Sequence, residues 1–574
     1  MLINILRTYT GPYRVRVAVV LVLLLLQTMA NLAVPSLNAD IVNNGVAKGD
    51  TPYIWRVGAV MLGVTAVQAA LSMLTVYLAS RVAMAFARDL RSDVFRRVLS
   101  FSTQEMDAFS NASLITRNTN DVQQVQTLVY MGLMMLISAP ITMIGGVLMA
   151  LRHNLQMSGL IAVTVPLMGI VIGIMMKFSL PQFRVMQTRV DRVNGVMREQ
   201  ITGLRVIRAF VRDAVEQVRF ETASAELRDT QLRVNRLFAF AMPTLMFIMN
   251  LSTVGVVWFG GNLVATGDML IGDIGAFMAY MMQILMSVMM ATMGLIMVPR
   301  AVASAERIHA VLHTTPGIDN PRSPIAAAAP GAVSLHDVTF QYPGAEEAVL
   351  HNISFAVEPG QFAAIVGGTG SGKTTLVNLL MRFYDASAGS VRVNGTDVRE
   401  QDLAQMWSTV ALVPQRALLF SGSVRDNVRF GAQDIDDEAV WRALEVAQAR
   451  DFVEALDAGL EHEIAQGGQN LSGGQKQRLS IARAVAMRPS IYVLDDAFSA
   501  LDAATDARLR AALHHEMAGA TVIVVAQRIS TILHADRIIV LDEGAVAGVG
   551  THDELMASCA AYREIVGSQL EVNA

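Results

Sequence analysis

The sequence predicts two fold classes in series: an α-helical membrane domain with six spans and long helical extensions, then a soluble α/β domain. Of the 574 residues, 53% are hydrophobic and 16% are charged, whereas soluble domains carry about 25% charged residues. Nearly all of the apolar excess lies before residue 300. The net charge of -4 disfavours a nucleic-acid-binding protein. The single cysteine, Cys559, excludes an intrachain disulfide.

Six apolar windows are long enough to cross a bilayer, which takes about 20 helical residues. None contains Asp, Glu, Lys or Arg, and a charge at a helix centre costs roughly 2.5–3.5 kcal/mol. The first window follows Arg7, Arg14 and Arg16, as in a signal peptide, but the five further spans favour a retained helix. The predicted spans are residues 17–39, 57–80, 128–151, 157–176, 237–265 and 274–298.

Arginine predicts the orientation of these spans. Arg residues gather in the long stretches between spans two and three and between spans four and five, whereas the opposite loops are short. The positive-inside rule therefore places both termini and the soluble domain in the cytoplasm. We expect a multi-pass protein of a bacterial inner membrane. The two long stretches have helical spacing and are interrupted at residues 109–113 and at Gly203, so we expect helices that project from the membrane and dock on another domain.

A stretch rich in Pro, Gly and Ala separates the two halves. Residues 314–332 read TTPGIDNPRSPIAAAAPGA, a composition typical of a linker. The predicted domains are therefore a membrane domain over residues 1–313 and a soluble domain over residues 333–574.

The soluble domain contains a phosphate-binding loop. The apolar run 362–366 predicts a buried strand, and the GxxxxGK[ST] pattern follows it directly. Glycines let backbone N–H groups surround a polyphosphate, the lysine reaches the β/γ-phosphates, and the first threonine hydroxyl is a Mg²⁺ ligand. The predicted nucleotide-binding residues of this loop are Gly367, Gly368, Thr369, Gly370, Ser371, Gly372, Lys373, Thr374 and Thr375.

Two further motifs complete the nucleotide chemistry. The apolar run 491–495 predicts a strand that ends in Asp495, which is suited to hold Mg²⁺. Leu471-Ser-Gly-Gly-Gln475 opens a predicted helix and forms a second anion site at a helix N-terminus. Because one nucleotide needs one such loop, the second site indicates a nucleotide that another domain holds.

With these motifs, the chain resembles an exporter-type half-transporter of the ATP-binding cassette (ABC) superfamily over essentially its whole length. The resemblance implies a six-helix membrane domain fused to a P-loop NTPase α/β nucleotide-binding domain, with ATP and Mg²⁺ as cofactors. It implies that Tyr342 stacks on adenine and that Gln415 senses Mg²⁺ as a further ligand beside Thr374 and Asp495. Residues 499–502 resemble the D-loop at the dimer interface, and residues 109–121 and 199–210 resemble the two coupling segments.

The chain departs from the family pattern at two catalytic positions. Asp496 stands where the family has the glutamate that activates water, and Gln527 stands at the switch histidine; Gln466 is a milder departure. Of the residues with catalytic roles in the family pattern, Gln415 is retained and Asp496 and Gln527 are replaced. A displacement of about 1 Å costs about 10²-fold in rate, and loss of a positioned base costs about 10²–10⁴-fold. We expect the chain's own site to bind ATP and hydrolyse it slowly; neutral drift with full activity is the alternative.

The intact signature motif predicts a heterodimer. In this superfamily each ATP lies between one subunit's P-loop and the other subunit's signature. The competent site would therefore use this chain's signature together with a partner half-transporter that carries the catalytic Glu and the switch His. The residues predicted to bind that nucleotide in trans are Leu471, Ser472, Gly473, Gly474 and Gln475. The chain then resembles the degenerate-site subunit of bacterial heterodimeric multidrug and lipid exporters.

The uncharged, Met-rich spans predict a hydrophobic or amphipathic substrate such as a drug or lipid, although helix packing and lipid contact also explain methionine. The leading hypothesis is therefore an ATP-driven export translocase. The alternative is a regulatory ATP-binding half of an importer of lipids or siderophores on the same scaffold.

Overall fold

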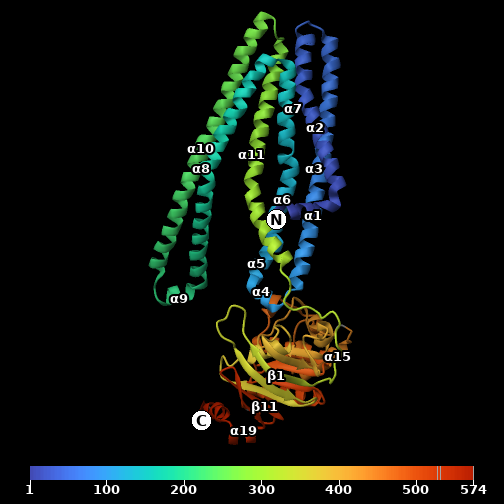
Figure 1. Cartoon of the computed structure of the whole chain (residues 1–574), viewed down its shortest axis with the longest axis vertical. Coiled ribbons are helices and arrows are strands. Elements are labelled where there is room, and N and C mark those ends of the chain that lie inside the picture. Colours follow the sequence, from blue (N-terminus) through green and yellow to red (C-terminus); the bar gives the residue numbers. More distant parts are fainter. Residues whose placement is uncertain (433, 527, 530–531, 573–574) are drawn as a thin grey trace. The chain divides into compact units, whose positions relative to one another are not determined.

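The computed structural model describes residues 1–572 except 433, 527 and 530–531 (Figure 1). Its internal contacts divide the chain into two compact units. The helical unit contains residues 1–99 and 112–314, and the nucleotide unit contains residues 100–111 and 315–574. The short segment 100–111 therefore belongs with the second unit although both of its flanks belong to the first.

Within the described residues, six helical stretches of the helical unit are long and apolar enough to cross a membrane, which confirms the predicted number of spans. Three of these stretches contain short π-type or 3-10 turns within an otherwise continuous helix. The helices of this unit are α1 (Leu2–Thr10), α2 (Arg14–Asp40), α3 (Thr51–Leu99), α5 (Asn111–Thr116), α6 (Val122–Met131), α7 (Ser138–His153), α8 (Leu155–Thr202), α9 (Leu204–Ala209), α10 (Asp213–Thr266) and α11 (Ile271–His313).

Helices α8 and α10 extend beyond the apolar windows, as the sequence predicted. They contain 48 and 54 residues, so each is about 70–80 Å long at 1.5 Å per residue, more than twice the ~30 Å hydrocarbon core. Their extensions are polar and are joined by Arg189–Glu226 and Arg219–Glu199 ion pairs. Gly203 ends α8, and the short helix α9 lies at the shared tip (Figure 1).

The nucleotide unit contains a four-stranded antiparallel sheet and a six-stranded mixed sheet, in the orders β2-β1-β4-β5 and β12-β11-β3-β10-β9-β6, and a two-stranded ribbon β7-β8. The strands are β1 (Val333–Phe340), β2 (Leu350–Val357), β3 (Phe362–Gly367), β4 (Ala388–Val393), β5 (Thr396–Asp397), β6 (Val410–Val413), β7 (Gly422–Ser423), β8 (Glu463–Ile464), β9 (Ile491–Asp495), β10 (Thr521–Val525), β11 (Arg537–Asp542) and β12 (Ala545–Gly550).

Helices cover this sheet core. They are α12 (Lys373–Leu380), α13 (Leu403–Thr409), α14 (Val424–Arg429), α15 (Asp437–Val446), α16 (Arg450–Glu454), α17 (Gly473–Met487), α18 (Ala503–Glu516), α19 (His552–Ser558) and α20 (Ala560–Val572). The unit also includes α4 (Thr103–Phe109).

The central strands of the six-stranded sheet are buried on both faces. In β3, Ala363 and Ile365 belong to one apolar cluster, whereas Ala364 and Val366 belong to another. Alternate residues of a strand point to opposite faces, so a continuous apolar run is required here. Because β3, β10, β9 and β6 are parallel, their carboxyl ends lie at one edge of the sheet and bring the residues that follow them together.

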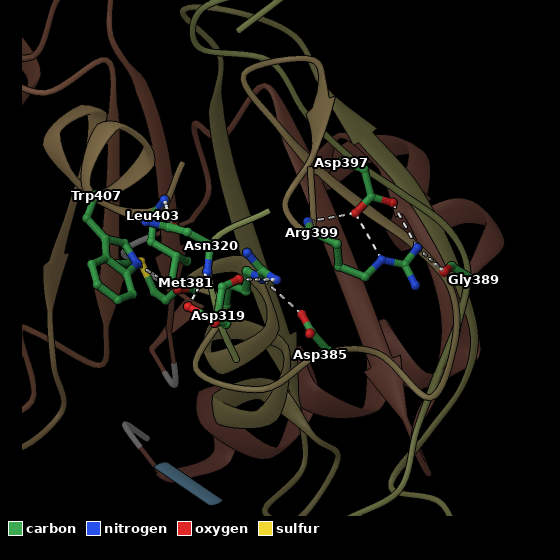
Figure 2. A network of polar contacts seen from close by, with 10 residues as sticks. Asp319, Asn320, Met381, Asp385, Gly389, Asp397, Arg399, Leu403 and Trp407 are labelled. Carbon is green, nitrogen blue, oxygen red and sulfur yellow. Dashed lines mark hydrogen bonds and ion pairs between the residues drawn. The ribbon is translucent and has the colours of Figure 1, made fainter. Parts of the chain in front are cut away.

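The stretch 314–332 contains no helix or strand among its residues, and much of it is bonded to the nucleotide unit (Figure 2). The Asn320 side chain accepts a hydrogen bond from the Leu403 N–H at 2.8 Å and donates one to Asp402. The buried Arg382 donates to the Asp319 carbonyl and to Asp385. This part of the chain therefore follows a fixed path along the surface of the unit.

Candidate functional site

The loop between β3 and α12 has a backbone that requires glycine. Gly370 and Gly372 have φ values of +84° and +95°, a region that side chains other than glycine rarely adopt. A Cβ on Gly372 would lie 2.5 Å from Leu350 Cδ2, and one on Gly367 would lie 2.3 Å from the Leu541 carbonyl oxygen. The loop therefore brings bare backbone to the N-terminus of α12, the arrangement that binds polyphosphate.

Lys373 lies at this loop. Its Nζ donates to the carbonyl oxygens of Gly367 and Gly368 at 2.9 and 2.6 Å. Burial lowers the pKa of this ammonium group, while the carboxylates of Asp495 and Asp496 oppose that shift. The lysine is thus a partly desolvated cation beside two acids, which suits it to a phosphate group.

Thr374 and Asp495 form the oxygen-rich part of the site. The Thr374 hydroxyl is hydrogen-bonded to the Asp495 carboxylate, and Asp495 is 5% exposed. Burial raises the pKa of Asp495, and the neighbouring Asp496 charge adds to the increase. Hydroxyl and carboxylate oxygens are the donors that Mg²⁺ prefers, so this pair fits the cation that would neutralise the buried acid and polarise the nucleotide phosphates.

Asp496 adopts a left-handed backbone conformation. Its φ is +48°, and its N–H donates to the Val525 carbonyl at the end of β10. Its side chain accepts a hydrogen bond of 3.3 Å from the Gln415 amide. The structure thus brings Gln415 to the acid that occupies the base position, a pairing that the sequence did not indicate. The other substituted position, Gln527, lies outside the described residues.

The signature residues begin α17. Ser472 caps this helix, because its hydroxyl accepts the Gln475 N–H while its own N–H donates to the Gln475 side chain. A Cβ on Gly474 would lie 3.2 Å from the Ala500 carbonyl oxygen. The signature therefore lies against the predicted D-loop, and its helix N-terminus has the geometry that binds an anion.

Comparison with known proteins decides the family. Two family models match, "ABC transporter transmembrane region" over residues 17–288 and "ABC transporter" over residues 350–499. An uncharacterized ABC transporter ATP-binding protein of Mycobacterium tuberculosis is 46% identical over 99% of this chain and 98% of its own length. The chain belongs to the ABC transporter family. It is an exporter-type half-transporter, with the membrane domain fused to the ATP-binding domain.

Other relatives and one solved structure agree with this assignment. The ATP-dependent lipid A-core flippase of Vibrio vulnificus is 28% identical over 97% of this chain and 96% of that protein. A multidrug efflux ATP-binding/permease protein of M. tuberculosis is 31% identical over 94% of this chain, which spans 45% of that longer protein. A bacterial Atm1-family ABC exporter with ATP bound has the same fold, with a TM-score of 0.81, 23% identity and coverage of 97% and 98% of the two chains.

In this half-transporter, Tyr342 belongs to an aromatic cluster beside the phosphate loop. Its hydroxyl lies 3.0 Å from Thr375 Oγ1, and its half-buried ring packs edge-to-face with Phe340 and Tyr384. The Tyr384 hydroxyl donates to Asp107 of α4 at 2.8 Å, and this contact raises the pKa of Tyr384, although burial is the larger cause.

The prediction of a coupling segment at residues 109–121 was wrong in position. The helix that packs with the nucleotide unit is α4, because Ser102 and Glu105 form a capping box that begins a helix there. Glu105 also accepts the Gly317 N–H at 3.1 Å. Residues 112–121 belong to the helical unit. Sequence reasoning missed Tyr384 and Asp107, since they lie 277 positions apart and neither is part of a motif that we recognised.

Replacing Lys373 with Met is expected to weaken Mg·ATP binding by the purified chain about 10–100-fold. The change removes charge-assisted hydrogen bonds worth about 1.5–3 kcal/mol and keeps the apolar stem. Equilibrium binding of a fluorescent ATP analogue measures the loss, and thermal unfolding without nucleotide checks the fold. Unchanged affinity in a stable variant would exclude Lys373 from the ATP site.

Proposed function

We propose that this chain is one subunit of an ATP-driven heterodimeric exporter in the bacterial inner membrane, with the nucleotide unit and both termini in the cytoplasm. It would move a hydrophobic or amphipathic drug-like or lipid-like substrate outward. The observation that carries the proposal is the combination of a complete phosphate loop with Asp496 at the base position. A complete phosphate loop supports ATP binding, while the shorter acid supports slow hydrolysis at the chain's own site.

The hydrogen bond between Gln415 and Asp496 supports this division of labour. A general base has to lie within about 2.6–3.2 Å of the water that it activates. Asp496 is one methylene shorter than the family's glutamate, and its carboxylate already accepts the Gln415 amide. The acid therefore has less reach and is held by a neighbouring side chain. Mg²⁺, held by Thr374 and Asp495, would supply charge stabilisation to the phosphates.

Exposed apolar surface in each unit supports a second subunit. At the tip of the helical unit, Val206, Phe210 and Val211 are 60–83% exposed. In the nucleotide unit, Leu418, Phe420 and Phe430 are 44–57% exposed, and the two phenylalanine rings are stacked with centroids 4.5 Å apart. Apolar patches on both units are typical of interaction surfaces. We propose that a second half-transporter, carrying the catalytic Glu and the switch His, covers them.

The substrate class rests on the character of α11 and on the relatives. Met282, Met286, Met290 and Met293 recur at helical spacing and are each 41–49% exposed. Methionine side chains adapt to apolar ligands of varied shape. The relatives named as a multidrug efflux protein and as a lipid A-core flippase support the same class. Membrane lipids also contact such a surface.

Affinity purification of the tagged chain from its own cells tests the pairing. We expect a second half-transporter to copurify, with Glu and His at the positions that match 496 and 527. In vesicles containing both subunits, a fluorescent lipid or amphipathic dye should move outward when ATP is added. Inward movement would favour the importer alternative. Brisk ATP hydrolysis and transport by this chain alone would overturn the heterodimer.

Replacing Tyr384 with Phe is expected to lower transport about tenfold and to leave ATP affinity within about threefold. The change removes only the hydroxyl that donates to Asp107, and a hydrogen bond to a charged group contributes about 1.5–3 kcal/mol. Dye transport and ATP binding are measured on the same vesicles. The matched control is Tyr562→Phe, which removes a hydroxyl hydrogen-bonded to His552 instead. Equal transport by both variants would show that the α4 contact does not link ATP to the membrane helices.

A further inference from the structure

One end of the helical unit carries the three short connections between spans, opposite the tip formed by α9 (Figure 1). These connections are residues 41–50, Asn154 and residues 267–270. Given the proposed cytoplasmic position of the nucleotide unit, this is the outer end of the membrane domain. Here a group of polar side chains joins α2, α7 and α11, which are spans one, three and six.

The hydrogen positions in this group follow from its acceptors. The buried Tyr280 hydroxyl donates its only hydrogen to the Leu32 carbonyl at 2.8 Å. The Ser36 hydroxyl, 2.7 Å from the Tyr280 oxygen, must therefore donate to it. With its own hydrogen used, Ser36 accepts from His153 Nε2 at 2.9 Å. His153 Nε2 consequently carries a hydrogen.

The other ring nitrogen of His153 faces a carboxylate. Nδ1 lies 3.5 Å from Asp273 Oδ1, and the two side chains are 18% and 19% exposed. Asn43 holds the acid in place, since its amide donates to Asp273 Oδ1 at 3.1 Å and its carbonyl oxygen accepts the Gly272 N–H at 2.7 Å. Because Nε2 already carries a hydrogen, a neutral ring would point a lone pair at Asp273. The doubly protonated ring satisfies both neighbours.

A cavity of 480–820 Å³ is not needed to reach this pair by unfolding, because the side chains already line an open one of 680 Å³. The ionisable groups that line it are Asp40 from α2, Arg152 and His153 from α7, and Asp273 from α11. Asp40 accepts hydrogen bonds from Tyr53 and Asn44. Water and protons from the outer side therefore have access to the His153–Asp273 pair.

We propose that protonated His153 is a positioning residue that clamps the outer ends of spans one, three and six together through Ser36 and Asp273. Loss of its proton, or separation from Asp273, loosens the clamp and favours opening toward the outside. The direction of this opening rests on the proposed export function, whereas the clamp itself does not depend on ATP.

Distance measurement between spin labels tests the clamp in the full chain, reconstituted in lipid nanodiscs without nucleotide. Labels on Lys48→Cys and Leu155→Cys report the outer ends, with Cys559→Ser removing the native thiol. Between about pH 6 and about pH 9, on either side of the imidazole reference value, we expect the longer-distance population to rise about threefold, as suits a partly exposed ion pair. His153→Gln should be long at both pH values, and His515→Gln should behave as the parent.

Asp273→Asn is the second variant, because it keeps the size of the side chain and removes the charge that faces His153. It should also abolish the pH response. A parent distance that does not change with pH, or a response that survives in both variants, would overturn the clamp. A membrane-impermeant thiol reagent applied to intact cells locates Lys48→Cys separately. If that cysteine is reached only from the cytoplasm, the proposed export topology fails while the distance result still tests the clamp.

Discussion

Replacing Asp496 with glutamate is expected to raise ATP hydrolysis at this chain's own site about 10²-fold. The longer side chain restores the reach of the family's base while leaving the phosphate loop and the Thr374–Asp495 pair unchanged. A part of the gain is lost because glutamate adopts the left-handed conformation of position 496 less readily than aspartate. The rate is measured in the two-subunit transporter after the partner's catalytic glutamate has been replaced by glutamine, so that only this site remains.

Asp496→Asn is the matched control for this experiment. It preserves the size of the side chain and an oxygen that accepts the Gln415 amide, but it removes the charge. If Asp496 is not a working base, the asparagine variant should hydrolyse ATP within about threefold of the parent, since no base-catalysed fraction of about 10²–10⁴-fold is there to lose. A large loss in this variant, with no gain in the glutamate variant, would show that Asp496 is already an effective base and that the site is not impaired.

Replacing Ser472 with aspartate is expected to lower ATP hydrolysis by the two-subunit transporter about 10²-fold or more. Aspartate caps a helix as well as serine does, so α17 should keep its start. It places a negative charge at the N-terminus that is proposed to cover the partner's ATP, and a like charge facing phosphate costs several kcal/mol. Steady-state hydrolysis measures the loss, while ATP binding to this chain's phosphate loop should be unaffected.

Ser472→Asn separates charge from size in this position. Asparagine also caps helices and resembles aspartate in volume, so it should retain most of the activity. If the aspartate and asparagine variants were equally active, the signature of this chain would not cover the hydrolysed nucleotide. Equal losses from Ser472→Asp and from Lys373→Met would instead contradict a division between a holding site and a working site.

Local patterns were sufficient for the architecture. Six uncharged windows gave the spans, because a charge in hydrocarbon costs too much to be hidden by packing. The positions of Gly203 and of the phosphate loop were also local, since a helix break and a left-handed turn depend on the residue at that point. The docking helix was misplaced by a few residues, because the capping box at Ser102 and Glu105 was overlooked although it is a sequence pattern.

Contacts between distant residues could not be read in this way. Sequence by itself determined that this protein is a membrane half-transporter with a P-loop and two substituted catalytic positions, since each of these properties belongs to a continuous stretch of chain. Only the tertiary structure placed Gln415 on Asp496, Tyr384 on Asp107 and His153 between Ser36 and Asp273. Those pairs are separated by 81 to 277 positions where hydrogen bonds join them, and helix and strand packing, which no short pattern encodes, decides which of them meet.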